Sequence, residues 1–206
     1  MKTISFSTII AVHVTNRVSG ITGLLIACAF LVGCAGPISD PSELAVKVAR
    51  PGPPPAEKAL VRIHRPRASQ GYALYTGVWD SNHFLADLGN GHSTGYVCDP
   101  GDHYFVNRSV ERIGVVEVSA KPGKTYDLWL DTAGLFIASF QLEPVKAGSR
   151  QWKLVPKWMD EHMWIGRAPL ADKHEQDRQN DIRIILEDFK GTKKDRVRHL
   201  GDEDAR

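Results

Sequence analysis

The feature that most constrains this sequence of 206 residues is a series of short apolar runs with a period of two, which occupies residues 58–145. In the first run, "KALVRIHRPR", Ala59, Val61 and Ile63 alternate with a mixed face, as in a strand with one buried side. The runs that follow are residues 72–80, 83–88, 93–98, 102–108, 113–120, 125–131 and 135–145. Short strands at this spacing predict a mainly β chain that folds as an antiparallel β-sandwich or barrel.

Turn residues separate these runs. They form the segments "DSN" at 80–82, "GNG" at 89–91, "DPG" at 99–101 and "KPGK" at 121–124. Glycine and asparagine tolerate positive φ, and proline fixes the first corner of a turn. The connections are therefore expected to be tight, which favours strands that pair with their neighbours in the sequence.

A hydrophobic segment at the start of the chain predicts export. Residues 21–32 carry no charge over twelve positions, whereas a bilayer span needs roughly 20 apolar residues. The length fits the apolar part of a secretory signal, with Lys2 and Arg17 before it. We therefore expect residues 1–33 to be a signal peptide.

The four residues Leu31-Val32-Gly33-Cys34 resemble the bacterial lipobox. In that motif a peptidase cuts before the cysteine, here between Gly33 and Cys34, and the cysteine thiol is acylated with a diacylglyceryl group. The resemblance implies that Cys34 is a lipidation site and that lipid holds the protein to a membrane. Two alternatives stay open: an ordinary signal peptide with an incidental cysteine, and a membrane anchor that is never cut.

The composition of the exported part excludes some partners. Residues 34–206 contain 24 basic and 24 acidic side chains, so this part is formally neutral and lacks the basic excess of a nucleic-acid-binding protein. Its second cysteine, Cys98, has no partner for an internal disulfide and is expected to be a buried, inert thiol, with a reactive thiol as the alternative. By analogy with lipoprotein sorting, Ala35 after the cysteine favours the outer membrane, with the protein facing the periplasm.

The chain divides into four parts by composition. After the signal, residues 34–57 are proline-rich and are expected to be a lipidated tether; residues 58–145 form the β-sandwich domain. Residues 146–206 contain a Trp-rich segment, an amphipathic helix and a charged tail that is expected to be solvated.

Two features of residues 146–206 bear on function. Trp152, Trp158 and Trp164 either complete the core of the sandwich or form a strip for binding a partner. The helix is predicted from a stripe with a period of 3.6, which should pack on the sheet over about four turns. The stripe consists of Ile182, Ile185, Leu186 and Phe189.

Three stretches resemble a bacterial lipoprotein family called Domain of Unknown Function 2846. They are "VRIHRP", "GYALYTGVWDSNHFLADLGNGHSTGYVCDPGDHYF" and "VEVSAKPGKTYDLWL", within residues 58–143. The resemblance implies an antiparallel sandwich of the transthyretin-like or fibronectin-like type behind a lipid anchor. It implies no known activity.

The sequence contains no catalytic or metal-binding signature. Its histidines have neither helical His-x-x-x-His spacing nor paired cysteines, no serine lies in a Gly-x-Ser-x-Gly turn, and a site built from His64 and Asp87 would depend on tertiary proximity. We therefore expect no catalytic residue, no cofactor and no metal, and a non-catalytic envelope lipoprotein that binds an envelope protein or a cell-wall component. The alternative is a metal-binding protein or enzyme whose histidines gather at one end of the sandwich. The histidines in question are His64, His83, His92, His103 and His162.

Overall fold

The structure is a computed structural model that describes residues 38–133 and 138–206, which belong to one compact unit, Ala35–Arg206. The six-stranded sheet has the order β1 (Ala45–Lys47), β10 (Met163–Arg167), β5 (His92–Cys98), β2 (Ala59–Arg65), β8 (Thr125–Ala133) and β9 (Ser139–Pro144). The five-stranded sheet has the order β11 (Arg198–Leu200), β7 (Ile113–Ala120), β6 (Gly101–Arg108), β3 (Thr76–Asp80) and β4 (His83–Leu88). The helices are α2 (Arg150–Glu161) and α3 (Ala171–Lys190), with short 3-10 turns η1 (Lys194–Arg196) and η2 (Asp202–Asp204).

The prediction of a mainly β chain is confirmed, and every predicted run in residues 58–145 contains a strand. The prediction of a purely antiparallel arrangement is wrong, because β2 pairs with β8, β10 with β5 and β11 with β7 in parallel. Tight turns force antiparallel pairing only between strands that they connect. The partners in all three parallel pairs are far apart in the sequence, so no turn sets their direction.

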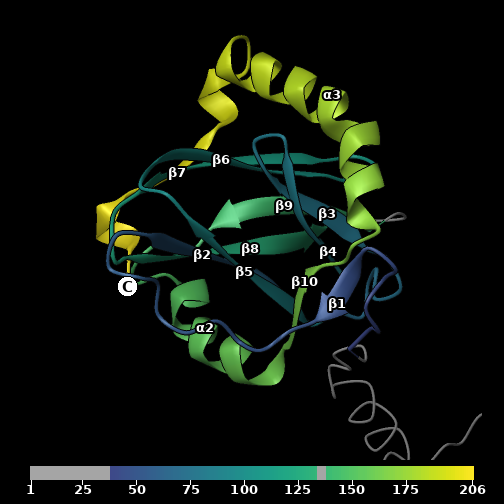
Figure 1. Cartoon of the computed structure of the whole chain (residues 1–206), viewed down its shortest axis with the longest axis horizontal. Helices are drawn as coiled ribbons and strands as arrows, with labels where there is room; N and C mark the ends of the chain where they lie inside the picture. Colours follow the sequence, from purple (N-terminus) through teal and green to yellow (C-terminus); the bar gives the residue numbers. More distant parts are fainter. Residues whose placement is uncertain (1–37, 134–137) are drawn as a thin grey trace, which may run out of the picture. The chain divides into compact units, whose positions relative to one another are not determined.

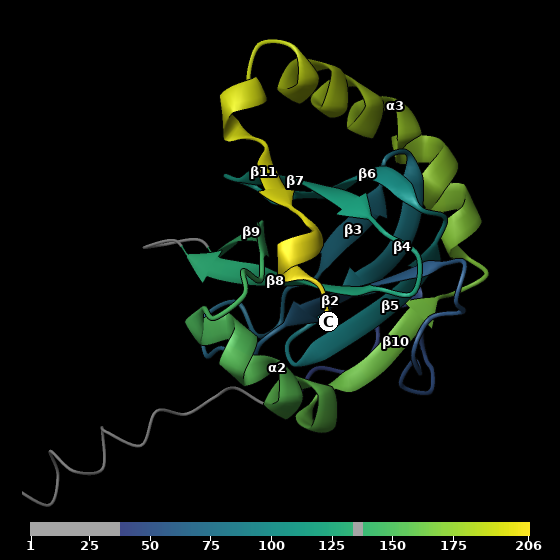
Figure 2. The ribbon, with the colours of Figure 1, turned by 90° about the vertical axis from the view of Figure 1, so that its left-hand side faces the viewer.

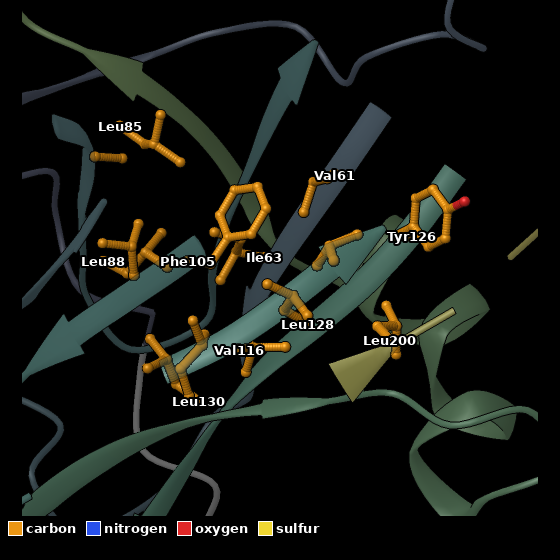
Figure 3. Close-up of a cluster of buried hydrophobic side chains, with 14 of the residues drawn as sticks. Val61, Ile63, Leu85, Leu88, Phe105, Val116, Tyr126, Leu128, Leu130 and Leu200 are labelled. Carbon is orange, nitrogen blue, oxygen red and sulfur yellow. The ribbon is translucent and has the colours of Figure 1, made fainter. Parts of the chain in front are cut away.

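The two sheets and two helices form four layers (Figure 1). Side chains from both sheets share the main core, which includes Val61 and Leu128 of the larger sheet and Phe105 and Val116 of the smaller one (Figure 3). Helix α3 lies over the outer face of the five-stranded sheet, and α2 lies over the outer face of the six-stranded sheet (Figures 1 and 2). Large parts of both sheets are therefore covered on both sides, which hides much of the polar face expected of a half-buried strand.

The predicted amphipathic stripe is confirmed. All four of its apolar residues are buried, and they pack against Trp79, Phe84, Val106 and Val115. The helix has 20 residues, which is between five and six turns and longer than expected. Among the described residues, no helix has the length and apolarity needed to cross a membrane.

Residues 38–57 do not form a free spacer in the part that the structure describes. Strand β1 pairs with β10, Ala45 is buried, and Arg50 Nη1 lies 2.9 Å from Asp160 Oδ1. The apolar residues in the expected tether are enough to add an edge strand to the larger sheet.

The charged C-terminal segment also packs against the fold, contrary to the expected solvated tail. Val197 and Leu200 are buried, and β11 adds an edge strand to the smaller sheet. Asp204 is buried, and its carboxylate accepts hydrogen bonds from Lys146 Nζ at 2.7 Å and the Ala147 amide at 2.9 Å. Two apolar residues and one paired carboxylate thus fix a segment whose composition is that of a surface tail.

We expect Leu200→Ala to lower the free energy of unfolding by about 2 to 5 kcal/mol, because it leaves a cavity in the main core. Ile184→Ala on the exposed side of α3 is the matched control and should change stability by less than about 0.5 kcal/mol. Urea titration of the two variants measures both values. Equal stabilities of the two variants would show that β11 does not contribute to the core.

Candidate functional site

The residues predicted from the sequence to matter for function fall in different places. Gly33 and Cys34 lie outside the described residues. Trp152 and Trp158 are on α2, and Trp164 is on β10. Trp158 and Trp164 are buried, and Trp152 is half-buried beneath the Arg206 guanidinium, 3.6 Å from its ring centroid. All three contribute to packing between the larger sheet and the layer that covers it.

Polar side chains from three neighbouring strands meet beneath α2. Arg62 and His64 come from β2, Ser93 from β5 and Asp127 from β8. The strand registers place Ser93 opposite His64 and Asp127 opposite Arg62. Alternation along β2 puts Ala59, Val61 and Ile63 into the main core and Arg62 and His64 on the outer face. We call this group, together with His162, the buried polar row.

The negative charge in the row is the Asp127 carboxylate. Burial opposes its ionisation, but hydrogen bonds from His64 and Arg62 outweigh burial and lower the pKa of Asp127. Arg62 binds it with Nε and Nη2, each at 2.8 Å, and His64 Nε2 lies 3.1 Å from Oδ1. Bidentate pairing of this kind is among the strongest hydrogen bonding that a buried carboxylate can obtain.

The hydrogen bonds of the row all run in one direction, from His162 through Ser93 and His64 to Asp127. Burial lowers the pKa of His64, so its ring is neutral, and its Nε2–H donates to Asp127. The His64 Nδ1 atom is then an acceptor and receives the Ser93 hydroxyl proton at 2.8 Å. Ser93 Oγ in turn accepts from His162 Nδ1 at 2.9 Å. Burial lowers the pKa of His162 to about 3, which keeps this ring neutral as well.

Aromatic rings cover the row. The Trp158 ring centroid is 5.5 Å from that of His64 and 6.3 Å from that of His162. Trp164 meets His64 edge to face at 6.0 Å. These rings exclude water from the imidazoles, which is the desolvation that lowers both histidine pKa values.

Arg206 links the row to α2. Pro156 lies inside that helix, and because proline has no N–H the carbonyl of Trp152 loses its usual partner four residues later. Arg206 Nη2 donates to this carbonyl at 2.7 Å, and Arg206 Nε lies 3.1 Å from Asp127 Oδ2. One guanidinium therefore satisfies both the buried carboxylate and the carbonyl that proline leaves free.

Ser93, His64 and Asp127 have the connectivity of a serine-hydrolase triad. Ser93 and His64 are fully buried and Asp127 is 1% exposed, so no substrate reaches the serine oxygen. The hydroxyl proton and one lone pair are also engaged by the two histidines. The row is therefore a structural network.

The structure does not bring His64 and Asp87 together. Asp87 lies on β4 in the other sheet, whereas the partner is Asp127. The parallel pairing of β2 with β8, which brings Asp127 to β2, has no signal in the local sequence.

The histidines do not share one end of the fold. His64 and His162 lie beneath α2, whereas His103 of the smaller sheet contacts Asp80 Oδ2 at 2.7 Å and the Asp99 carbonyl at 2.8 Å. The hydrogen bond with Asp80, followed by one with Cys98, raises the pKa of His103 to about 11. Cys98 itself is a buried free cysteine. Within residues 38–133 and 138–206, no group of three or more His, Cys, Asp or Glu side chains could hold a metal ion.

An open hollow of about 440 Å³ lies between α3, β3 and the segment that follows Pro66. We call it the aromatic hollow. Its volume falls in the range of small-molecule sites, about 300 to 1,000 Å³. Its lining includes Leu74, Tyr75, Trp79, Arg108, Val110, Phe140, His174, Arg178, Asp181 and Ile182. Leu74, Tyr75 and Val110 are exposed, Val110 to 78%.

Arg65 holds the wall of the aromatic hollow in place. This buried guanidinium donates to the carbonyls of Leu74 at 2.5 Å, Gly71 at 2.7 Å and Leu88 at 2.7 Å. It also lies 4.1 Å from the centroid of the Phe140 ring. Burial lowers the pKa of Arg65 to about 10, so the side chain stays charged at neutral pH. The segment that carries the exposed residues Leu74 and Tyr75 is therefore fixed by a buried anchor.

No family model, curated protein or solved structure matches this chain. The resemblance to the lipoprotein family therefore stays a prediction.

The buried polar row predicts that stability falls in acid. The pKa values of His64 and His162 lie below 6.5 in the folded protein, so below pH 6.5 the unfolded chain binds protons that the folded chain does not. The contribution of these two histidines to stability should be full above about pH 6.5. Below that pH, each should lower the free energy of unfolding by up to about 1.4 kcal/mol per pH unit until the pH reaches its pKa in the folded protein, which is about 3 for His162. Urea titrations between about pH 4 and about pH 8 measure this slope.

The matched variants for this prediction are His162→Gln and Leu200→Ala. His162→Gln removes one titrating ring and should flatten the slope between pH 6.5 and pH 4. Leu200→Ala lowers stability in the main core without changing the rings that cover the row, so it should keep the slope. An unchanged slope in His162→Gln would contradict the assignment.

Proposed function

We propose that this chain is a lipid-anchored, non-catalytic lipoprotein of the cell envelope, whose aromatic hollow binds another envelope protein or a cell-wall component. The observation that carries the proposal is the group of exposed apolar side chains in the wall of the hollow. Soluble proteins expose few contiguous apolar patches, and such patches often mark binding sites. Leu74, Tyr75 and Val110 border a hollow of small-molecule size, and Arg65 holds the segment that carries two of them.

The location rests on the sequence. The lipobox-like residues that end at Cys34 support a lipid anchor, and Ala35 supports the outer membrane with the protein facing the periplasm. We also propose that the two sheets are a transthyretin-like or fibronectin-like sandwich, extended by the edge strands β1, β10 and β11. The antiparallel pairs among β3, β4, β6 and β7 support this assignment.

Cys34→Ser tests the anchor. We expect the variant to leave the membrane fraction or to stay at precursor length, because stable anchoring takes more than one acyl chain and the serine hydroxyl cannot replace the thiol. Cys98→Ser is the matched control and should fractionate like the wild type. Immunoblots of membrane and soluble fractions give both results. A Cys34→Ser protein of mature length in the membrane fraction would show that the lipobox interpretation is wrong.

Photo-crosslinking tests the binding surface. A photoreactive amino acid at Val110 should form a discrete adduct in intact cells, because this side chain is exposed at the hollow. The same group at Ile184, which is also exposed but outside the hollow, is the matched control and should form none. Adducts at both positions, or at neither, would refute the hollow as the binding surface.

A further inference from the structure

The aromatic hollow has one apolar side. Trp79 of β3 and Phe140 of β9 form the buried part of the wall, and Tyr75 continues it to the surface. Exposed Leu74 and Val110 extend the apolar surface towards solvent. A ligand that fills the hollow therefore needs an apolar body.

The helix side of the hollow is charged. His174, Arg178, Asp181 and Ile182 occupy positions along one side of α3, and only Ile182 is apolar. Arg178 Nη1 lies 3.3 Å from Asp181 Oδ2, and Arg108 Nη1 lies 3.6 Å from the same oxygen. Two cations share one carboxylate, so one positive charge remains unbalanced at the rim.

The other groups on this side do not change the sign of the charge. Lys173 Nζ lies 2.6 Å from Asp177 Oδ2, and the buried charge of Arg65 offsets that of Asp87. Burial lowers the pKa of His174, whose ring packs against Phe84 at 4.9 Å and Trp79 at 5.8 Å, so His174 adds no charge at neutral pH. An excess of one positive charge matches a monoanion such as a carboxylate. A phosphate monoester carries closer to two negative charges at neutral pH.

We propose that the aromatic hollow binds a single-chain carboxylate amphiphile, with the chain against Leu74, Tyr75 and Val110 and the carboxylate between Arg108 and Arg178. This inference rests on the proposed binding function of the hollow and names the class of its ligand. The guanidinium groups supply charge-assisted hydrogen bonds, and the apolar side of the hollow removes the chain from water.

The experiment uses residues 35–206 without the acyl anchor, because this part is one compact unit with its own core and needs no detergent. Isothermal titration calorimetry at pH 7 compares three probes: decanoate, acetate, and decyltrimethylammonium, which joins the same chain to a cationic head. We expect saturable binding of decanoate at one site. Acetate should not bind because it lacks the chain. Decyltrimethylammonium should bind at least about tenfold more weakly than decanoate, which corresponds to a difference of about 1.4 kcal/mol in binding free energy.

Variants locate the two halves of the site. Arg108→Gln and Arg178→Gln should each weaken decanoate binding by about five- to tenfold. Arg183→Gln, which removes the same charge from the same helix outside the hollow, is the matched control and should stay within about twofold. Leu74→Ser should weaken decanoate binding without affecting the fold, because Leu74 is exposed. Circular dichroism of each variant verifies folding.

Three results would overturn the proposal: no saturable binding of decanoate, equal binding of the cationic amphiphile, or equal loss of affinity in Arg183→Gln. These results are distinct from a failure of the proposed function. An adduct at position 110 without decanoate binding would leave the binding surface in place and remove only the ligand class. If decanoate binds but Cys34→Ser stays where the wild-type protein is found, the ligand class is supported and the lipid anchor is refuted.

Discussion

The buried carboxylate of Asp127 is the constraint on which the outer side of the larger sheet depends. A charge in this position costs several kcal/mol in desolvation unless it is paired and hydrogen-bonded. Arg62, His64 and Arg206 provide the partners, the first two from strand β2 and the third from the C-terminal segment. Because a buried charge that loses one partner is strongly destabilising, these separate segments are tied to one arrangement.

The same requirement explains why a helix with an internal proline can cover this sheet. Pro156 weakens α2 by leaving the Trp152 carbonyl without its helical partner. Arg206 supplies the missing hydrogen bond and stacks on the Trp152 ring, while its Nε atom is bound to Asp127. The defect in the helix and the charge in the sheet are thus compensated by one side chain, which lies 50 residues away from Pro156 in the sequence.

Local sequence predicted the strands of residues 58–145 and the apolar stripe of α3, because both depend on periodicity within a few residues. It did not predict α2, whose Trp-rich sequence contains a proline, nor β10 and β11, which are too short to show a period. The buried polar row was also out of reach. His64 could be singled out, but Ser93 and Asp127 meet it only through strand pairings that link residues 29 and 63 positions apart. The aromatic hollow depends in the same way on segments from separate parts of the chain.

The two outer faces of the sheets are covered in different ways, and the difference explains the hollow. Beneath α2, every charge of the buried polar row has a partner and aromatic rings exclude water. Helix α3 instead buries Ala171 and then no further residue until Ile182, a distance of about 16 Å at 1.5 Å per residue. The face between them carries His174, Arg178 and Asp181, where closure of the core would require apolar side chains. The sequence of α3 therefore leaves a hollow beside the sheet at this place, and it puts the charges of Arg178 and Asp181 next to exposed apolar residues.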